Sequence, residues 1–173
     1  MNKKGIAALI STGVIALASP FLMNFLGKWE GREHVVYADK LAGGLPTVCK
    51  GITRWTSPYP VIVGERWSVE KCNEVERKVT IETQVKLAQC ITNKHITQPV
   101  FDALTSHAHN VGVGSTCASR AVRLINAGHI REGCDALAHS ENGRPAWSYA
   151  SGKFIQGLYN RRLGERKLCL TGT

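Results

Sequence analysis

The chain has 173 residues, of which 43% are hydrophobic and 20% charged. These values indicate a globular protein with a hydrophobic core and exclude a disordered chain. Lys and Arg number 22 against 13 Asp and Glu, which gives a formal net charge of +9. Such an excess favours a polyanionic partner, whether nucleic acid, anionic lipid or an acidic cell-wall polymer, and charge alone does not choose among them. The length fits one domain, or one domain with a short appendage.

The N-terminal region contains an uncharged stretch, residues 5–26, between Lys4 and Lys28. As one helix it would extend about 33 Å, enough to cross a hydrocarbon core of about 30 Å. The preferred interpretation is an export anchor whose N-terminal lysines stay on the cytoplasmic side. The alternatives are a signal peptide cleaved before Ser19 and a buried helix of the folded domain.

The next region is predicted to be short elements and turns. A mixture of polar and apolar residues predicts a short helix over Trp29–Tyr37. Residues 39–64 are rich in Gly and Pro, and they contain β-branched or aromatic runs at 47–49 and 59–63. This pattern predicts a small, irregular sheet or a set of hairpins.

The rest of the chain is predicted to be mostly helical. Capping residues, a proline in a first turn and a terminal glycine mark the helix boundaries. The expected helices are Ser68–Ile91, Thr97–Asn110, Ser115 or Thr116 to Gly128, Ile130–His139 and Lys153–Leu168. The predicted fold class is therefore α+β, with a small irregular β lobe before a mostly helical lobe and a hydrophobic helix at the N-terminus.

Six cysteines are spread over the region after residue 40. Their number is even and no pair has the C-x-x-C spacing of a zinc or redox site. Three disulfides in an oxidising compartment are preferred over six reduced, buried cysteines, because the N-terminus independently indicates export. The six histidines show no metal-binding spacing, so we expect no metal and no cofactor.

Glu30 and Asp39 are the first candidates for catalysis. Eight residues separate them, so their side chains can face one cleft if Glu30 ends a short helix and Asp39 lies on the next turn. Hydrolysis of a glycosidic bond requires two such carboxyl groups, and the hydroxyl of Thr47 can orient a water molecule. Taken singly, each of these residues is more often an ordinary surface or strand residue.

Together, the motifs resemble a known family. The order Glu-Gly at 30–31, Tyr-x-Asp at 37–39 and Pro-Thr-Val-Cys at 46–49 resembles the active-site segment of glycoside hydrolase family 24, the phage-type lysozymes or endolysins. The similarity continues at 101–112, 133–137 and 157–169, so it covers about residues 29–170. The weakly apolar N-terminus resembles that of the signal-anchor-release subgroup.

The resemblance implies a lysozyme-like fold with Glu30 as general acid, Asp39 as the carboxylate that positions or activates water, and Thr47 as its helper. It implies cleavage of the β-1,4 bond between N-acetylmuramic acid and N-acetylglucosamine with net inversion. One departure is that seven residues separate Asp39 from Thr47 where the family usually has five. The extra residues fall at Gly43–Gly44, and Thr53 is the alternative to Thr47.

The resemblance also implies location and partners. Residues 1–27 are expected to form the anchor segment and residues 28–173 the catalytic domain. The expected partners are peptidoglycan glycan strands and the inner membrane, with no nucleic acid, and the protein is expected to be a monomer. It would be exported across the host inner membrane, tethered there and then released to the periplasm. The implied disulfides are Cys49–Cys72, Cys90–Cys117 and Cys134–Cys169.

Several side chains carry open alternatives. Glu33 either tunes the pKa of Glu30 from the same helix face or is simply solvated. Arg161 or Arg162 either pairs with Glu30 or belongs to a basic solvated face. The aromatic side chains either stack on sugars or fill the core; they are Trp55, Trp67, Trp147 and Tyr149.

The proximity of anchor and acid predicts a coupling between them. Glu30 follows Leu26 by four residues, about 6 Å along a helix, so a tethered enzyme would hold its acid at the bilayer and become active on release. Residues 1–30 contain no cysteine, which excludes a thiol switch there. The alternative functions are a lytic transglycosylase, a membrane-tethered cell-wall-binding protein without catalysis, and a nucleic-acid-binding protein, which the export segment opposes.

Overall fold

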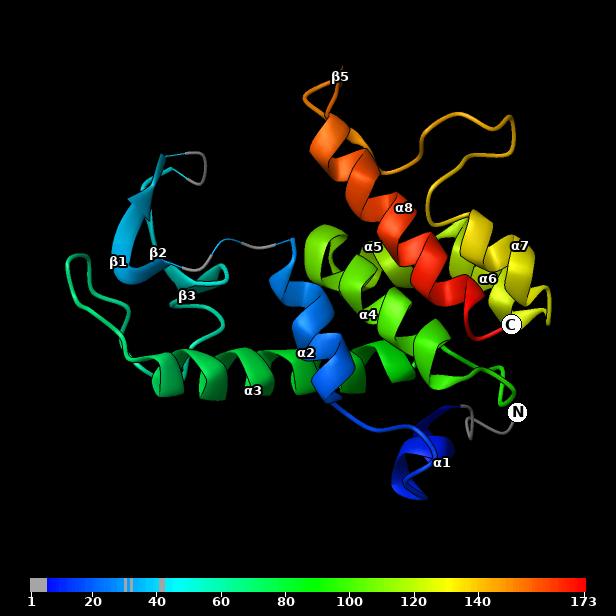
Figure 1. The fold of residues 1–173 in the computed structure, drawn as a ribbon, viewed down its shortest axis with the longest axis horizontal. Helices are drawn as coiled ribbons and strands as arrows, with labels where there is room; N and C mark the ends of the chain where they lie inside the picture. The colour runs from blue at the N-terminus through cyan, green and yellow to red at the C-terminus, as the bar shows by residue number, and fades with distance from the viewer. Residues whose placement is uncertain (1–5, 30, 32, 41–42) are drawn as a thin grey trace. The chain divides into compact units, whose positions relative to one another are not determined.

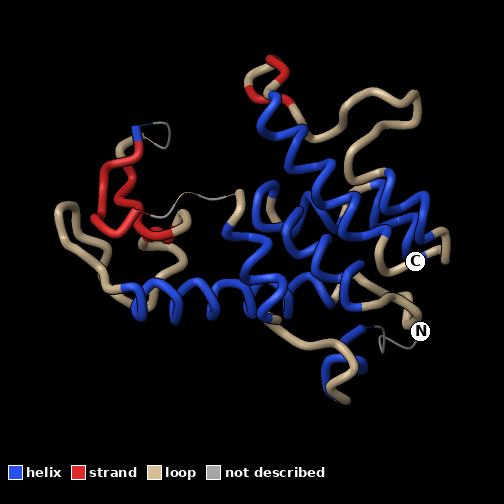
Figure 2. Tube along the Cα trace, in the orientation of Figure 1, coloured by secondary structure: helices blue, strands red, loops and turns tan. Residues whose placement is uncertain are grey.

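The computed structural model describes residues 6–29, 31, 33–40 and 43–173. Figures 1 and 2 show the order of helices and strands along the chain. The chain divides into two compact units. A sheet unit comprises Ala18–Glu82, and a helical unit comprises Thr83–Thr173 together with the described part of Met1–Leu17. The predicted α+β class, with a small β region and a mostly helical region, is confirmed.

The sheet unit contains an antiparallel sheet in the order β1-β2-β3. Its strands are Glu33–Asp39, Leu45–Cys49 and Ile52–Thr53. One face of this sheet covers a small core that includes Val36, Val48 and the fully buried Trp67. The predicted small sheet is therefore present, but the run at 59–63 is not a strand.

The predicted helix over Trp29–Tyr37 is wrong, because β1 occupies Glu33–Asp39. Val35, Val36 and Tyr37 are β-branched or aromatic, and such side chains fit a half-buried pleated strand better than a helix. Pairing with β2 satisfies the backbone at the two ends of β1. Between them, Val36 N–H donates to the carbonyl of Glu65 at 2.8 Å, and the carbonyl of Val36 accepts from Gly64 N–H at 2.9 Å.

A long helix follows the sheet. α3 runs from Val69 to Ala88, close to the predicted Ser68–Ile91. Its N-terminus is capped as expected, because the Ser68 hydroxyl oxygen accepts a hydrogen bond from the backbone N–H of Lys71 at 3.1 Å.

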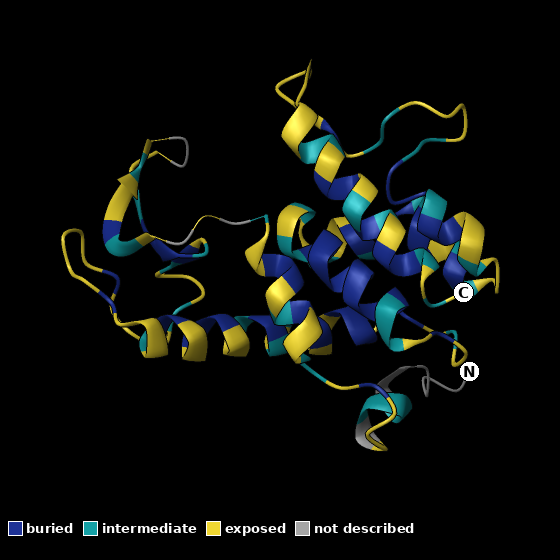
Figure 3. Cartoon of the chain, viewed as in Figure 1, coloured by how far each residue is buried: buried dark blue, intermediate teal, exposed yellow. Residues whose placement is uncertain are grey.

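The helical unit is built around α4, Gln98–Val111. Thr97 and Pro99 lie at the start of α4, as predicted, and residues 100–108 are all buried (Figure 3). A helix that is buried on every side forms the centre of a core. The elements of this unit that follow α4 are α5 Val113–Cys117, α6 Arg120–Asn126, α7 Ile130–Asp135, β4 Tyr149–Ala150, β5 Lys153–Phe154 and α8 Gln156–Leu170.

Three predicted helices differ in their bounds. The segment from Ser115 or Thr116 to Gly128 forms two helices, because Ser119 interrupts it and caps α6 by accepting from Val122 N–H at 3.2 Å. α7 ends at Asp135 and not at His139. Lys153 belongs to the β4–β5 hairpin, so α8 begins at Gln156.

The uncharged N-terminal stretch is not one helix. It forms α1, Ile6–Ser11, and α2, Pro20–Gly27. Gly13 and Ala18 adopt left-handed backbone conformations between them, and Ser19 caps α2 at its Pro20 start. The expected single hydrophobic helix is therefore corrected to two short ones. Over the described residues, no helix combines the length and apolar character needed to span a membrane.

The apolar side chains of this stretch face inward. In the helical unit, Ile15 is buried and Gln98 bonds both the N–H and the carbonyl of Ala16, at 2.7 and 3.0 Å. In the sheet unit, the inner face of α2 is buried and Arg77 donates to the carbonyl of Ala18 at 2.9 Å. The stretch thus contributes to the core of each unit.

The predicted disulfide pairing is confirmed. Cys49–Cys72 closes a segment of the sheet unit. Cys90–Cys117 and Cys134–Cys169 lie within the helical unit. All six cysteines are used, and the crosslinks limit the conformational freedom of the unfolded chain.

Candidate active site

The pairing of β1 with β2 places Asp39 and Thr47 on one face of the sheet. Thr47 lies opposite Tyr37, and Asp39 lies opposite Leu45. Opposed residues of an antiparallel pair share a face, as do residues two apart on one strand. Asp39 and Thr47 are therefore diagonal neighbours, typically about 7–8 Å apart, a separation that one water molecule can bridge.

Two glycines lie in the turn between these strands. Gly43 and Gly44 have φ values of 65° and 82°, a left-handed conformation that glycine adopts without steric cost. The N–H of Gly44 donates to the carbonyl of Asp39 at 2.7 Å. The turn that contains the extra residues thus returns the chain so that β2 pairs with the end of β1.

Thr47 is buried, and its hydroxyl has a defined hydrogen-bonding state. It donates its hydrogen to the carbonyl of Leu45 at 3.0 Å, which leaves the oxygen lone pairs as acceptors. The alternative Thr53 lies directly opposite Thr47 on β3. Its hydroxyl oxygen accepts the N–H of Trp55 at 3.3 Å, a bond that belongs to the following turn.

Tyr37 is a neighbour that the sequence did not single out. It lies opposite Thr47, two residues from Asp39, and is 41% exposed. Partial burial raises the pKa of Tyr37, and the negative charges of Asp39 and Glu33 raise it further. The phenol therefore stays protonated beside Asp39 and can donate a hydrogen bond. The motif Tyr-x-Asp was the signal, since two residues on a strand share a face.

Glu30 lies outside the described residues, so its position and its predicted pairing with Arg161 or Arg162 stay predictions. Glu33 is exposed at the start of β1, opposite Cys49. Glu33 lies in a strand and not in the predicted short helix. Glu33 instead fits the other alternative, a solvated carboxylate.

The two arginines form a buried cluster in the helical unit. Arg161 Nε and Arg162 Nη2 lie 3.2 and 2.9 Å from Glu165 Oε1, and the Ser106 hydroxyl donates to the same oxygen at 2.7 Å. Both arginines and Glu165 are buried, which excludes the alternative of a basic solvated face. The signal was the Arg-Arg-x-x-Glu spacing, which places Glu165 three and four residues beyond the arginines on one helix face.

His107 lies beside this cluster and is fully buried. Burial lowers its pKa to about 3, and the charges of Arg162 and Arg161 act in the same direction. Its Nδ1 lies 2.9 Å from Thr116 Oγ1. Because the Thr116 hydroxyl donates to the carbonyl of Gly112 at 3.0 Å, Nδ1 carries the proton and donates. His107 is thus a neutral structural histidine.

The four aromatic candidates divide by exposure. Trp67 is 1% exposed and belongs to the core, so its proposed contact with sugar is excluded. Trp55 is 75% exposed and stacks with Arg54 at 4.7 Å. Trp147 and Tyr149 of the helical unit are 38% and 52% exposed. Of these four side chains, only Trp55, Trp147 and Tyr149 are exposed enough to contact a ligand.

Comparison with known proteins identifies the family. Residues 27–165 match the family model for phage lysozyme. The chain belongs to the phage lysozyme family. This phage lysozyme is a glycoside hydrolase, and its sequence relatives extend over nearly its whole length. The SAR-endolysin of Enterobacteria phage P21 is 32% identical over 172 residues, which covers 98% of this chain and 96% of the relative. That of Bacteriophage PS119 is 33% identical over 171 residues, 98% of this chain and 95% of the relative.

Solved structures show the same fold. A mutant of P22 lysozyme is similar with a TM-score of 0.76 and 23% identity, over 90% of this chain and 99% of that one. The endolysin from Escherichia coli O157:H7 phage FAHEc1 is similar with a TM-score of 0.68 and 25% identity, over 91% and 96%. Within the described part of this phage lysozyme, no group of three His, Cys, Asp or Glu side chains is placed to hold a metal ion.

Proposed function

We propose that this phage lysozyme is an endolysin that hydrolyses the β-1,4 bond between N-acetylmuramic acid and N-acetylglucosamine in peptidoglycan and so lyses the host cell. The observation that carries the proposal is the shared sheet face of Asp39 and Thr47 within the segment that matches the family. A carboxylate and a hydroxyl in diagonal positions suit the activation of one water molecule.

In the proposed mechanism, Glu30 donates its proton to the glycosidic oxygen as the bond to the anomeric carbon breaks. Asp39 accepts a proton from a water molecule whose oxygen bonds to that carbon from the opposite side. Thr47 can accept the second hydrogen of this water, since its own hydrogen is committed to Leu45. The configuration inverts, no glycosyl-enzyme forms, and proton exchange with solvent restores Glu30 and Asp39.

Product analysis tests this reaction. Digestion of purified peptidoglycan, followed by ¹H NMR, should show the α anomer of the reducing end first, because direct water attack inverts the β linkage. Asp39→Asn should lose most of this activity. Initial β anomer would contradict inversion. Anhydro-muramyl ends would show a lytic transglycosylase, which would overturn the role of Asp39 in water activation.

We also propose that residues 1–27 act as an export anchor and residues 28–173 as the catalytic domain. The uncharged stretch and the SAR-endolysin relatives support this. The inward packing of Ile15, Leu22 and Phe25 supports a released form in which the same side chains belong to the folded protein. Tethered and folded placements of these side chains exclude each other, so activity follows release.

Membrane fractionation tests the release. Collapse of the membrane potential in expressing cells should move the protein from the membrane to the soluble fraction and start lysis. As a control, Thr12→Leu with Asn24→Leu makes the stretch more apolar and should keep the protein in the membrane. An unchanged distribution of the wild type would overturn the release model without affecting the assignment of the reaction.

A further inference from the structure

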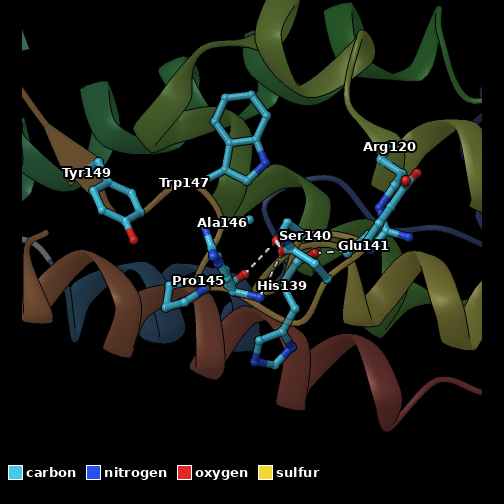
Figure 4. A pocket seen from close by; sticks show the side chains of 11 residues that line it. Arg120, His139, Ser140, Glu141, Pro145, Ala146, Trp147 and Tyr149 are labelled. Atoms are coloured by element: carbon cyan, nitrogen blue, oxygen red, sulfur yellow. Dashed lines mark hydrogen bonds between the residues drawn. The ribbon is translucent and has the colours of Figure 1, made fainter. Parts of the chain in front are cut away.

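The helical unit contains a pocket of about 690 Å³ beside the loop of residues 139–149 (Figure 4). Every residue that lines it belongs to the helical unit, so its description needs nothing from the sheet unit. The predicted chemistry of Glu30, Asp39 and Thr47 does not use it. Figure 4 shows Trp147 and Tyr149 toward one end of the pocket and Arg120 and Glu141 toward the other.

The aromatic end suits a sugar ring. Trp147 and Tyr149 are both large, partly exposed side chains on the pocket wall. The less polar face of a pyranose packs on such rings, and the methyl of an N-acetyl group adds apolar area. Phe154 lies against Tyr149 with a ring separation of 5.7 Å, which supports the Tyr149 ring from the β4–β5 hairpin.

The polar side chains that line the pocket supply both donors and acceptors. Arg120 and Arg144 provide N–H groups, Glu141 provides acceptors, and the amide of Asn142 provides both. This mixture matches hydroxyl and amide groups better than it matches a simple anion. Arg120 is held in place, because its Nη2 donates to the carbonyl of His139 at 3.1 Å.

Backbone hydrogen bonds and a ring contact hold the pocket wall. Trp147 has φ of 55°, a left-handed conformation that a bulky side chain rarely adopts and that clusters at functional sites. Its ring meets the buried His107 edge-on at 5.1 Å. The backbone bonds from Ala146 N–H to Ala138 and from Ser140 N–H to Arg144, both 2.8 Å, fix the loop. Such preorganisation lowers the entropic cost of binding.

We propose that this pocket is a saccharide-binding site that holds an N-acetylated amino sugar of the glycan strand. The inference rests on the proposed function, which supplies the glycan. Trp147 and Tyr149 contact the ring and the N-acetyl methyl, and the polar side chains of the lining bond the hydroxyl and amide groups. The site adds affinity for the wall polymer through residues that take no part in bond cleavage.

Titration of the full-length protein with chitotetraose, followed by NMR, tests the site. The Trp147 indole N–H signal should shift as chitotetraose is added. Tyr149→Ala should raise the dissociation constant measured from this signal by about tenfold or more, a loss of close to 1.4 kcal/mol in binding free energy. Tyr149→Phe keeps the ring and should bind like the wild type. Trp55→Ala removes a more exposed tryptophan outside the pocket and should leave this signal unchanged. Cellotetraose, which lacks N-acetyl groups, should bind more weakly.

Two results would overturn the proposal: no shift of the Trp147 signal with chitotetraose, or equal affinity of Tyr149→Ala and the wild type. Equal affinity for cellotetraose would overturn the role of the N-acetyl group. The titration measures binding and not cleavage. Failure of the enzyme to cleave peptidoglycan would therefore contradict the proposed function, whereas the titration alone would still decide whether the pocket binds the saccharide. Normal cleavage without binding at Trp147 would contradict only this site.

Discussion

At the scale of single residues, Thr47 is the member of the candidate site whose hydrogen-bonding state is best defined. Its hydrogen points to Leu45, so toward a water molecule it can act only as an acceptor. Thr53 lies directly across the sheet from it, but its hydroxyl caps the turn that contains Trp55. Thr47 therefore has the proposed catalytic role, whereas the hydroxyl of Thr53 has a structural one.

Thr47→Ala should lower kcat about tenfold or more, because one hydrogen bond to the attacking water is lost. Thr47→Ser keeps the hydroxyl and should restore most of the rate. Thr53→Ala is the matched control and should change kcat less than about threefold. The measurement is initial-rate kinetics on purified peptidoglycan. A larger loss in Thr53→Ala than in Thr47→Ala would reverse the assignment.

His107 predicts a pH dependence of stability. In the unfolded chain its pKa is near the ordinary 6.5, and in the fold it is about 3. Below pH 6.5 the unfolded state therefore binds more protons, so the free energy of unfolding falls as the pH falls toward 3. The groups that face the imidazole are Arg161, Arg162, Thr116 and Trp147.

His107→Phe should flatten this dependence, whatever the mutation does to stability at neutral pH. Urea unfolding between pH 6.5 and 3.5 should show the wild type losing up to about 1.4 kcal/mol more per pH unit than the variant. Parallel curves for the two proteins would mean that His107 is already protonated in the fold.

Residue spacing in the sequence predicts part of the candidate site but not which charged side chains are buried. Glu30, Asp39 and Thr47 were all predicted from the order of residues in a short segment that resembles a family motif. Glu165 was missed, although its spacing from Arg161 and Arg162 was readable. Spacing on a helix says that charges are neighbours; it does not say that the helix face is buried against α4, which depends on the rest of the fold.

At the scale of elements, α6 and α7 pack closely around Gly133. A Cβ added at Gly133 would lie 2.5 Å from Cγ1 of Ile125 and 3.0 Å from the carbonyl oxygen of Ala121. Neither neighbour can move without displacing α6, because both are buried in the core of the unit. The close approach of the two helices thus depends on the absence of a side chain.

Gly133→Ala should lower the free energy of unfolding by about 1–3 kcal/mol, the usual cost of overpacking. Gly114→Ala in α5 is the control, since a Cβ there meets no atom within 4 Å and alanine favours the helix. It should be neutral or stabilising by up to about 1 kcal/mol. Chemical denaturation of both variants decides, and equal stabilities would show that α6 and α7 can separate at no cost.

Elements with strong end signals were predicted well, as in α3 with Ser68 and α4 with Pro99. β1 was not, because the mixed pattern at 29–37 has no clear period. The strand forms through its pairing with β2 and with residues 64–67, which are contacts between separate segments. The division between α5 and α6 depends on Ser119, whose capping role becomes visible only when both flanking helices are known.

At the scale of the whole molecule, the N-terminal stretch has two possible environments. Its composition predicts an anchor, and its length permits one membrane-spanning helix. In the folded protein it instead forms α1 and α2, with a break at Gly13 and Ala18 and with inward-facing apolar side chains. Sequence alone cannot choose between these environments, because the same apolar side chains satisfy both. The disulfides, by contrast, were predictable from the family resemblance.

The most direct test of the account is the activity of Glu30→Gln on purified peptidoglycan, measured as the loss of turbidity. The substitution keeps the shape of the side chain and removes the transferable proton, so we predict a fall in rate of about a thousandfold or more, with unchanged thermal unfolding. Glu33→Gln, which alters the exposed carboxylate three residues on, should retain nearly full activity. Full activity of Glu30→Gln, or loss of activity in Glu33→Gln alone, would contradict the assignment of Glu30 as the acid.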